Sequence, residues 1–344
     1  TGLIGTRIPD VGNPWLDAGI VPYSTMRYNT DKEYWENWFP ADFVVECFPG
    51  QFRNWFYSLL ALSTVMEGRV PFKTLLGHAL VKDETGRDMH KSWGNAILFD
   101  DAAEKMGVDV MRWMFASHNT EHNLLFGYAT ADKMRKQLIT LWNTYSFFVT
   151  YANLDGFDPA VEIDMETLTK SDRWIISKTN KFIKSAKTSY DTYQVFHLLS
   201  EARQLLDDLS NWYVRRNRRR FWKSENDSDK SAAYFTLYTV MIDFIKVMAP
   251  VLPFVCDKIY TNLVAPMKGE VFDSVHLCNF PKVDTSYIDE SILEEVDTII
   301  QIVSMGRAAR NKANIKIRQP LAELALFADK NIQDIALNNQ DEIL

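Results

Sequence analysis

Two side chains able to handle phosphate lie in one short loop, Gly86–Asn95, which we call the Lys91 loop. Lys91 supplies a cation and Ser92 a hydroxyl, and the preceding segment Phe72–Val81 is predicted to be a buried strand. In α/β proteins, a glycine-bracketed loop that follows a strand is a common position for groups that bind phosphate. A solvated turn without a function can have the same sequence, so the loop alone does not establish that the chain binds phosphate.

A second set of polar side chains follows another predicted strand, Ala41–Glu46. Glu46 ends this strand, Gln51 lies in the turn after it, and Trp55 lies near the start of a helix predicted over Phe52–Met66. Ligands of open α/β sheets bind at the carboxyl ends of strands. Glu46 and Gln51 are therefore candidates for binding the hydroxyl and carbonyl groups of a nucleotide-like ligand, with Trp55 as an apolar wall.

A cluster of basic and aromatic residues interrupts an otherwise acidic chain, whose formal net charge is −7. On a helical projection, Arg216 and Arg220 continue an apolar stripe, so they need carboxylate partners or lie beyond the bundle's edge, free for an anionic ligand. Guanidinium groups pair with phosphates and aromatic rings stack on unpaired bases, which favours RNA over the alternative of a solvated helix end. The candidate RNA-binding residues are Arg215, Arg216, Arg218, Arg219, Arg220 and Trp222. A second basic group is Arg307, Arg310, Lys312, Lys316 and Arg318.

The run from His118 to His122 matches the spelling of an inverted zinc-peptidase motif. That chemistry needs both histidines on one helical face and a third ligand, whereas Asn119 and Thr120 indicate a loop. Three widely separated cysteines show no metal-like pairing, so no metal site is predicted. The cysteines favour a reduced, cytoplasmic protein, and no apolar run is expected to approach a membrane span.

The predicted fold class is α/β followed by all-α. The first part alternates strands and helices, and the crossover from Ala41–Glu46 to Phe72–Val81 predicts parallel strands. The second part has the periodicity of a helix bundle, and Asn314–Arg318 alternates like a strand. The predicted bundle helices are Asp132–Tyr151, Ser171–Tyr190, Val195–Trp222, Ser231–Met248 and Asp289–Lys312.

Several ordered motifs together resemble class I aminoacyl-tRNA synthetases, and among these the isoleucyl-tRNA synthetase family. The resemblance covers nearly the whole chain. The motifs are Trp15–Gly19, Trp38–Asp42, Glu46–Gln51, Arg53–Phe56, Met89–Asn95, Asn211–Trp222, Gly306–Lys312 and Arg318–Pro320.

The resemblance implies roles for the candidate residues. Asp88–Ser92 aligns with the family's Lys-Met-Ser-Lys-Ser loop, with Asp88 and His90 in place of its first lysine and first serine. Lys91 and Ser92 are implied to be catalytic, because Lys91 matches the lysine that stabilises departing pyrophosphate. Glu46, Gln51, Met89, His90 and Lys91 are implied to bind ATP, with its Mg²⁺, or the adenylate, and Trp55 to form the isoleucine pocket.

The resemblance also predicts the organisation of the chain. Residues 1–130 are expected to be the C-terminal part of a Rossmann-like catalytic domain, 131–312 a helical anticodon-binding domain, and 313–344 the start of an appended region. The family's His-Ile-Gly-His motif does not occur in the sequence, and its editing domain would precede Trp15. We therefore expect a fragment of a cytoplasmic, monomeric isoleucine–tRNA ligase that cannot activate isoleucine alone. The alternative is a non-catalytic tRNA-binding module derived from such an enzyme.

Overall fold

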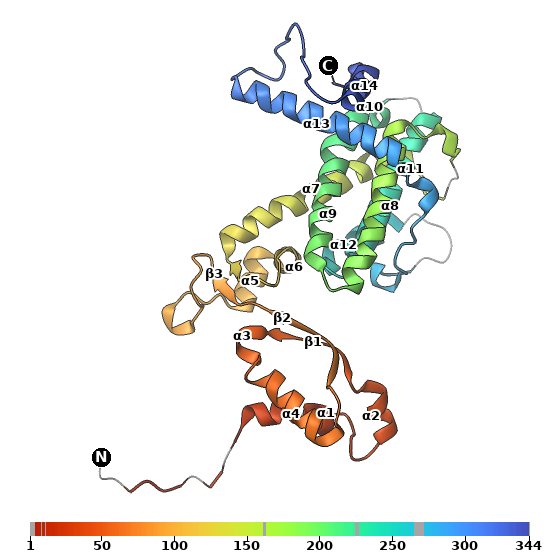
Figure 1. Cartoon of the computed structure of the whole chain (residues 1–344). Helices are drawn as coiled ribbons and strands as arrows, with labels where there is room; N and C mark the ends of the chain where they lie inside the picture. Colours follow the sequence, from red (N-terminus) through yellow and green to blue (C-terminus); the bar gives the residue numbers. More distant parts are fainter. Residues whose placement is uncertain are drawn as a thin grey trace. The chain divides into compact units, whose positions relative to one another are not determined.

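The computed structural model describes residues 4–7, 9–10, 12–160, 163–223, 227–264 and 272–343. The chain forms two compact units. The first comprises residues 1–105 and 118–131, and the second comprises residues 106–117 and 132–344. Figure 1 shows the elements of both units in chain order. Residues 1–3, 8, 11, 161–162, 224–226, 265–271 and 344 lie outside the described residues.

The first unit has the parallel βαβ arrangement that the sequence predicts. Strand β1 pairs in parallel with β2, and Glu46 lies opposite Gly77 in the register. The helix predicted over Phe52–Met66 is α4, which begins three residues later at Trp55, and the turn before it contains the short helix α3. The elements are α1 (Pro14–Ser24), α2 (Lys32–Trp38), β1 (Ala41–Cys47), α3 (Phe48–Gln51), α4 (Trp55–Glu67), β2 (Phe72–His78), β3 (Val81–Asp83), α5 (Phe99–Met106) and β4 (Leu124–Phe126).

The predicted strand Phe72–Val81 is too long. It ends at His78, and the chain then changes partners, because Ala79 donates its N–H to the carbonyl of Thr120. Strand β3 pairs in parallel with β4 in a separate two-stranded sheet. Two residues separate the end of β3 from the Lys91 loop, so this second pair of strands supports the loop.

The run Trp15–Gly19, which resembles a turn in sequence, forms the first part of helix α1. The Asn13 side chain caps this helix by accepting the N–H groups of Trp15 and Leu16. Gly19 allows α1 to approach α4 closely: a Cβ at this position would lie 2.7 Å from the Leu62 side chain. Helix α1 thereby packs against the helix that carries Trp55.

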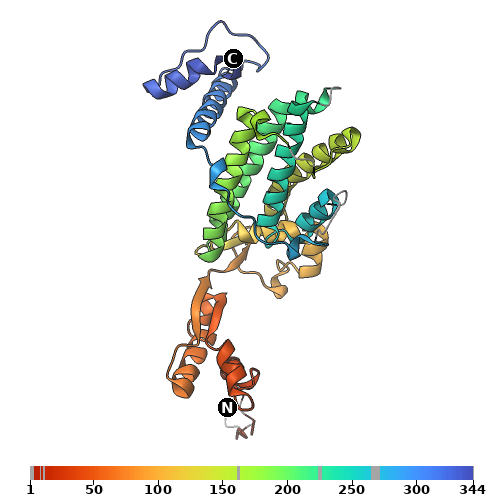
Figure 2. The same ribbon diagram turned by 90° about the vertical axis from the view of Figure 1, so that its right-hand side faces the viewer.

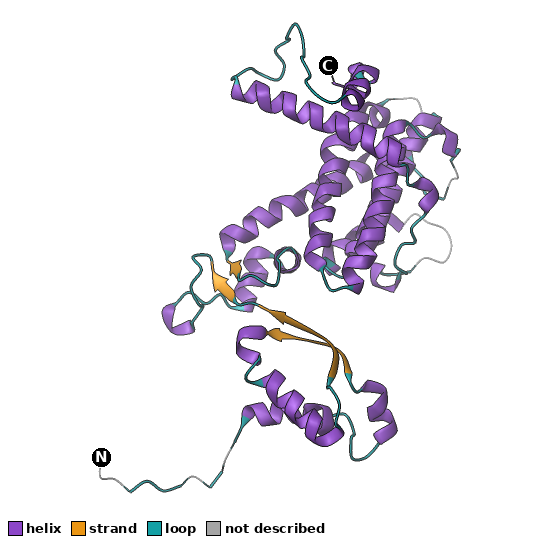
Figure 3. Cartoon of the chain, viewed as in Figure 1, coloured by secondary structure: helices purple, strands orange, loops and turns teal. Residues whose placement is uncertain are grey.

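The described part of the second unit is helical, as predicted, and the four strands found among the described residues lie in the first unit (Figure 3). Helices α8, α9 and α11 run side by side (Figures 1 and 2) and bury a continuous apolar core. The helices are α6 (Val108–Ala116), α7 (Tyr128–Asp155), α8 (Lys170–Asp191), α9 (Val195–Asp207), α10 (Arg215–Trp222), α11 (Ser228–Met248), α12 (Pro253–Val264), α13 (Glu290–Lys312), α14 (Lys330–Asn338) and α15 (Gln340–Ile343). Short 3₁₀ turns are Lys91–Trp93, Met165–Thr167, Val275–Leu277 and Thr285–Tyr287.

The predicted long helix Val195–Trp222 is continuous but not uniform. A π-helical segment, Asp208–Val214, joins α9 to α10. A π segment rotates the residues after it relative to those before it, which the regular projection of the sequence does not include. Which residues of α10 are buried and which are exposed therefore has to be taken from the structure, because the regular helical periodicity of the sequence does not predict it.

Two predictions about this unit are wrong. Asn314–Arg318 is a turn, because Arg310 donates from its side chain to the carbonyls of Lys316 and Gln319 and holds the chain in a loop. Helix α11 is long and apolar enough to cross a membrane by length and composition, contrary to expectation. Because 67% of its apolar window is buried inside the protein, its composition is that of a core helix.

Candidate functional site

Glu46, Gln51 and Trp55 lie together at the carboxyl end of β1. Glu46 Oε1 accepts the N–H of Cys47 at 2.8 Å. Gln51 Oε1 accepts the backbone N–H of Trp55, the first residue of α4, at 3.1 Å. The Trp55 indole N–H donates to the carbonyl of Ala18 at 3.2 Å. All three side chains are half-buried. The backbone of Trp55 thus orients the Gln51 side chain, the carbonyl of Ala18 orients the Trp55 ring, and part of each side chain stays accessible to a ligand.

Asp83, at the end of β3, organises the start of the Lys91 loop. Its Oδ1 accepts the N–H and hydroxyl of Thr85 at 2.9 and 2.7 Å and the N–H of Arg87 at 2.9 Å. Its Oδ2 accepts the Asn95 amide at 2.8 Å. The hydrogen bonds from Thr85, Asn95 and Arg87 hold the pKa of Asp83 well below its usual value, so the carboxylate stays charged.

Asn95 closes the other end of the same loop. Its amide nitrogen also donates to the carbonyl of Asp88 at 2.8 Å, and its Oδ1 accepts the N–H of His90 at 3.0 Å. One side chain therefore bonds to Asp83, to Asp88 and to His90. Sequence reasoning did not select Asp83 or Asn95, although polar residues at both ends of a candidate loop were a visible signal.

The tip of the loop carries its candidate catalytic groups. Lys91 and Ser92 begin a 3₁₀ turn, both are exposed, and neither side chain has a hydrogen bond or ion pair with the described residues. The ring of His90 packs edge-on against that of Trp93, with centroids 4.2 Å apart, and Met89 is half-buried. The clamped base and unpaired tip leave the Lys91 ammonium available for an anionic ligand.

The acidic residue in the loop, Asp88, has a cation beside it. Its Oδ1 lies 2.5 Å from Nζ of Lys82 on β3. The ion pair with Lys82 lowers the pKa of Asp88, chiefly through the hydrogen bond. Because this charge is compensated by Lys82, Asp88 does not need to pair with Lys91.

Some arginines of the cluster in the second unit are exposed to solvent, and others pair with carboxylates of the protein. Arg215, Arg218 and Arg219 are exposed, and no ion pair joins them to the described residues. The guanidinium of Arg218 lies 5.9 Å from the ring centroid of Phe147, and the Trp222 ring, 53% exposed, lies 6.4 Å from that of Tyr151. Cations and exposed rings on one helix form a surface suited to a nucleic-acid strand.

Arg220 points into the protein. Its two terminal nitrogens each lie 2.8 Å from an oxygen of Asp172, and its Nε lies 2.8 Å from Asp229 Oδ1. Asp172 also accepts hydrogen bonds from Thr169 and from the Tyr213 hydroxyl. Burial alone would raise the pKa of Asp172, but these bonds, led by that from Arg220, lower it. The sequence allowed Arg220 either to pair with a carboxylate or to lie beyond the bundle's edge, and the structure shows the first arrangement.

Arg216 is intermediate between these two classes. Its guanidinium stacks on Trp212 at 4.6 Å from the ring centroid and lies 3.2 Å from the carboxylate of Glu342. The pair is partly exposed, so a phosphate can compete with Glu342 for Arg216. In the second basic group, Arg310 binds its own loop, while Arg307, Lys312, Lys316 and Arg318 are exposed.

The pair His118 and His122 lies in a loop, not on a helix. The Nε2 of His118 bonds to the backbone carbonyl of His122 at 2.7 Å. Among the described residues, no three histidine, cysteine, aspartate or glutamate side chains are grouped so that they could hold a metal ion. The described geometry gives the peptidase motif no support.

The candidate residues thus form separate groups. Within the first unit, no hydrogen bond or ion pair between described residues joins Glu46, Gln51 or Trp55 to the Lys91 loop. The arginine cluster lies in the second unit. The geometry provides a group of polar and aromatic side chains at the end of β1, a loop with a clamped base and an unpaired lysine, and a helix face with exposed arginines and a tryptophan.

Comparison with known proteins assigns a family to each region. Residues 5–126 match the family described as tRNA synthetases class I (I, L, M and V), and residues 172–326 match that described as anticodon-binding domain of tRNA ligase. These two families correspond to the α/β and helical parts of the fold.

The chain is also similar to curated isoleucine–tRNA ligases. It is 42% identical to that of Clostridium novyi over 334 residues, covering 96% of this chain and 32% of the relative. It is 41% identical to that of Clostridium acetobutylicum over 324 residues, covering 93% of this chain and 31% of the relative. The chain therefore spans about a third of the length of these relatives.

Solved structures share the fold at low sequence identity. A LeuRS–tRNA–LeuAMS complex from Agrobacterium radiobacter has a TM-score of 0.63 at 14% identity, over 82% of this chain and 34% of that one. Methionyl-tRNA synthetase of Mycobacterium tuberculosis with methionyl-adenylate has a TM-score of 0.58 at 21% identity, over 72% of this chain and 49% of that one. These structures show the fold, and the sequence matches show that the chain is homologous to part of isoleucine–tRNA ligases and contains a class I tRNA synthetase region and an anticodon-binding domain of tRNA ligase.

Proposed function

We propose that the protein containing this chain is a cytoplasmic isoleucine–tRNA ligase, which activates isoleucine with ATP and transfers it to tRNA(Ile). The observation that carries the proposal is the similarity to isoleucine–tRNA ligases over nearly the whole chain, together with the free Lys91 on a clamped loop. In this proposal the chain supplies the loop, one edge of the adenylate pocket and a tRNA-binding surface.

The loop acts on the phosphates of ATP. The Lys91 ammonium stabilises the negative charge that develops on pyrophosphate as it leaves, and Ser92 donates from its hydroxyl. Met89 and His90 line the nucleotide beside them. The Mg²⁺ ion accompanies ATP as part of the substrate.

The strand-end group binds the aminoacyl part of the intermediate. The Glu46 carboxylate accepts hydrogen bonds from hydroxyl or ammonium groups, and Gln51 offers its amide nitrogen, since its oxygen is bonded to Trp55 N–H. The Trp55 ring, fixed by Ala18, supplies an apolar wall for the isoleucine side chain. A pocket of this kind favours isoleucine over valine by about 1–3 kcal/mol.

The anticodon-binding domain binds tRNA(Ile) through the exposed face of α10. Arg215, Arg218 and Arg219 contact phosphates, Trp222 stacks on an unpaired base, and Arg216 exchanges Glu342 for a phosphate. Arg220 supports this face from inside through Asp172.

The test is isoleucine-dependent ATP–pyrophosphate exchange by the protein that contains this chain, with and without Lys91→Ala. We expect exchange with the native lysine and a loss of about 100-fold or more in kcat after Lys91→Ala, with isoleucine affinity retained. Lys105→Ala, an exposed lysine of the same unit, is the control and should leave kcat unchanged. Exchange that Lys91→Ala does not alter would contradict the role of the loop, and a protein without any exchange would favour a non-catalytic tRNA-binding module.

A further inference from the structure

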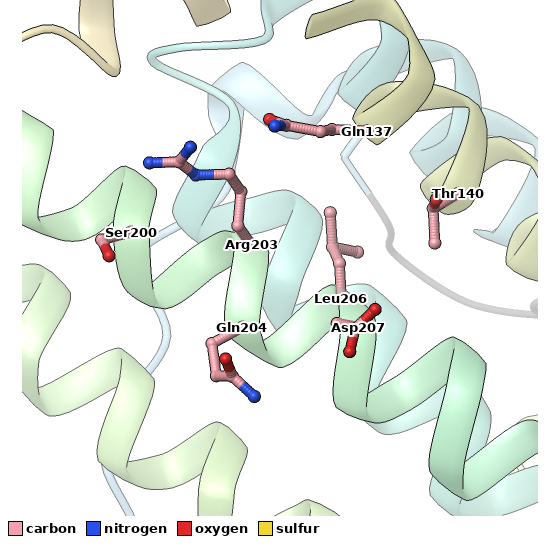
Figure 4. A pocket seen from close by; sticks show the side chains of 7 residues that line it. All are labelled: Gln137, Thr140, Ser200, Arg203, Gln204, Leu206 and Asp207. Atoms are coloured by element: carbon pink, nitrogen blue, oxygen red, sulfur yellow. The ribbon is translucent and has the colours of Figure 1, made fainter. Parts of the chain in front are cut away.

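A groove between α7 and α9 has no assigned role. It lies within the second unit, has a volume of about 490 Å³ and is lined by Gln137, Thr140, Ser200, Arg203, Gln204, Leu206 and Asp207 (Figure 4). Six of these seven residues are polar or charged. The volume is within the roughly 300–1,000 Å³ typical of sites for small molecules.

Arg203 gives the groove an uncommitted cation. Its Nε donates to the carbonyl of Leu199 at 3.2 Å, which anchors the side chain to its own helix. No carboxylate of the described residues lies within ion-pair distance of Arg203, in contrast to Arg216 and Arg220. Its two terminal nitrogens are therefore available to an anionic ligand.

Gln137 adds a second donor from the opposite wall. Its Oε1 accepts the indole N–H of Trp113 at 2.7 Å, and Trp113 is fully buried. The fixed indole sets the orientation of the amide, so the Gln137 nitrogen remains free to donate. Figure 4 shows Gln137 extending from α7 toward the side on which Arg203 extends from α9. An arginine and an amide donor together suit a phosphate group.

Acceptors occupy the remaining part of the groove. Gln204 donates its nitrogen to Asp208 at 3.0 Å, which leaves its Oε1 free to accept. One oxygen of Asp207 accepts the Asn211 amide, which leaves the other free. Acceptors beside a phosphate site suit a ribose hydroxyl or a base amino group, and a 2′-hydroxyl distinguishes RNA from DNA.

We infer that the α7–α9 groove binds one ribonucleotide unit of an RNA strand, with its phosphate on Arg203 and Gln137 and its ribose hydroxyl facing Gln204 and Asp207. Farther along α7, Phe147 lies beside Arg218 and Tyr151 lies beside Trp222, two residues of α10, which follows α9 through the π-helical segment. Arg203 and Arg218 are separated by roughly 20 Å along the helix, a distance that several nucleotides of one strand span. The inference rests on the proposed binding of tRNA and extends its contact surface to α9.

The test measures binding of a tRNA(Ile) transcript to the chain over a range of salt concentrations. Arg203→Ala should weaken binding about fivefold or more and reduce the slope of log affinity against log salt by about 0.7–0.9. Arg203→Lys should keep the slope, because it keeps the charge. Arg173→Ala, an exposed arginine of α8 that does not line the groove, is the matched control and should change neither quantity. Thermal unfolding of each variant verifies folding.

Two further measurements separate the possible failures. Gln137→Ala should also weaken RNA binding but leave the salt slope unchanged, because it removes a neutral donor. If the native chain binds the tRNA(Ile) transcript and the Arg203→Ala and Gln137→Ala variants bind it with the same affinity, the inference is overturned and the proposed function remains intact. Saturable AMP binding that Arg203→Ala abolishes, without an effect on RNA, would assign the groove to a free nucleotide and overturn the RNA assignment. A folded chain that binds no RNA would contradict both proposals.

Discussion

Asn95 and Asp83, which are 12 residues apart, are joined by a hydrogen bond of 2.8 Å between the Asn95 amide and Asp83 Oδ2. This bond closes the base of the Lys91 loop. Asn95 also holds the backbone of Asp88 and His90. The lysine at the tip is thus presented by a loop whose two ends are fixed to each other.

We therefore predict that Asn95→Ala loosens this loop without unfolding the first unit. One hydrogen bond contributes about 0.5–1.5 kcal/mol net, which corresponds to about a two- to twelvefold rise in the open population, and the loss of the three bonds of Asn95 should raise it by at least this factor. Trypsin cleavage after Lys91 should accelerate by that factor, as should hydrogen exchange at the His90 amide, which loses its acceptor. Glu104→Ala, an exposed residue of α5, is the control. Equal cleavage rates in the native and Asn95→Ala chains would show that the clamp does not restrain the loop.

Two neighbouring arginines of α10 should respond differently to substitution. Arg220→Ala leaves the Asp172 carboxylate buried without its cation and should reduce the free energy of unfolding by about 3–5 kcal/mol. Arg219→Ala, at an exposed position, should change it by less than about 0.5 kcal/mol. Adding Asp172→Asn to Arg220→Ala should recover part of the loss, because it removes the unpaired charge. Urea unfolding measures all three variants, and equal stability of the two single variants would contradict a structural role for Arg220.

Charge and stacking contributions to RNA binding can be separated on the same helix. Arg218→Ala should weaken tRNA binding and reduce the salt slope by about 0.7–0.9, since one phosphate contact is lost. Trp222→Ala should weaken binding by about 1–3 kcal/mol and leave the slope unchanged, because stacking releases no counterions. Lys184→Ala, at an exposed position of α8, is the control. If the slope falls with Trp222→Ala and not with Arg218→Ala, the assigned roles are wrong.

Asp243 on α11 predicts a pH-dependent stability. Burial raises the pKa of this carboxyl to about 6, and the nearby Lys246 offsets only part of that effect. The folded protein therefore binds the proton more tightly than the unfolded chain, so stability falls as pH rises from about 4 to about 6. Asp243→Asn should raise the free energy of unfolding on the order of 2 kcal/mol at pH 7.5 and have little effect at pH 4. A gain of equal size at both pH values would exclude ionisation as its cause.

Most of the architecture could be predicted from the sequence. The apolar periodicity of the helices and the crossover between β1 and β2 are local patterns, and the structure has both. The end of β2 could not be predicted, because it depends on Thr120 and Leu124, more than 40 residues away, which take over the pairing at Ala79 and Leu80. The turn at Asn314 likewise depends on a side chain, that of Arg310, which donates to the carbonyls of residues six and nine positions later.

The candidate site could be predicted only in part. The residue types of the Lys91 loop and of α10 pointed to phosphate and RNA, but the partners of each arginine depend on tertiary structure. Asp172, which holds Arg220, lies 48 residues earlier in the chain. The π-helical segment also changes which residues of α10 face outward. These features require the folded chain, because periodicity describes one helix at a time.

The most direct test of the account is the binding of tRNA(Ile), against tRNA(Val) as a control, to this chain over a range of salt concentrations. We predict tight binding that weakens steeply with salt and that prefers tRNA(Ile), with Arg218→Ala and Arg219→Ala each reducing the salt dependence. A folded chain that binds neither tRNA, or that binds both equally and without salt dependence, would contradict the assignment of the tRNA surface to α10.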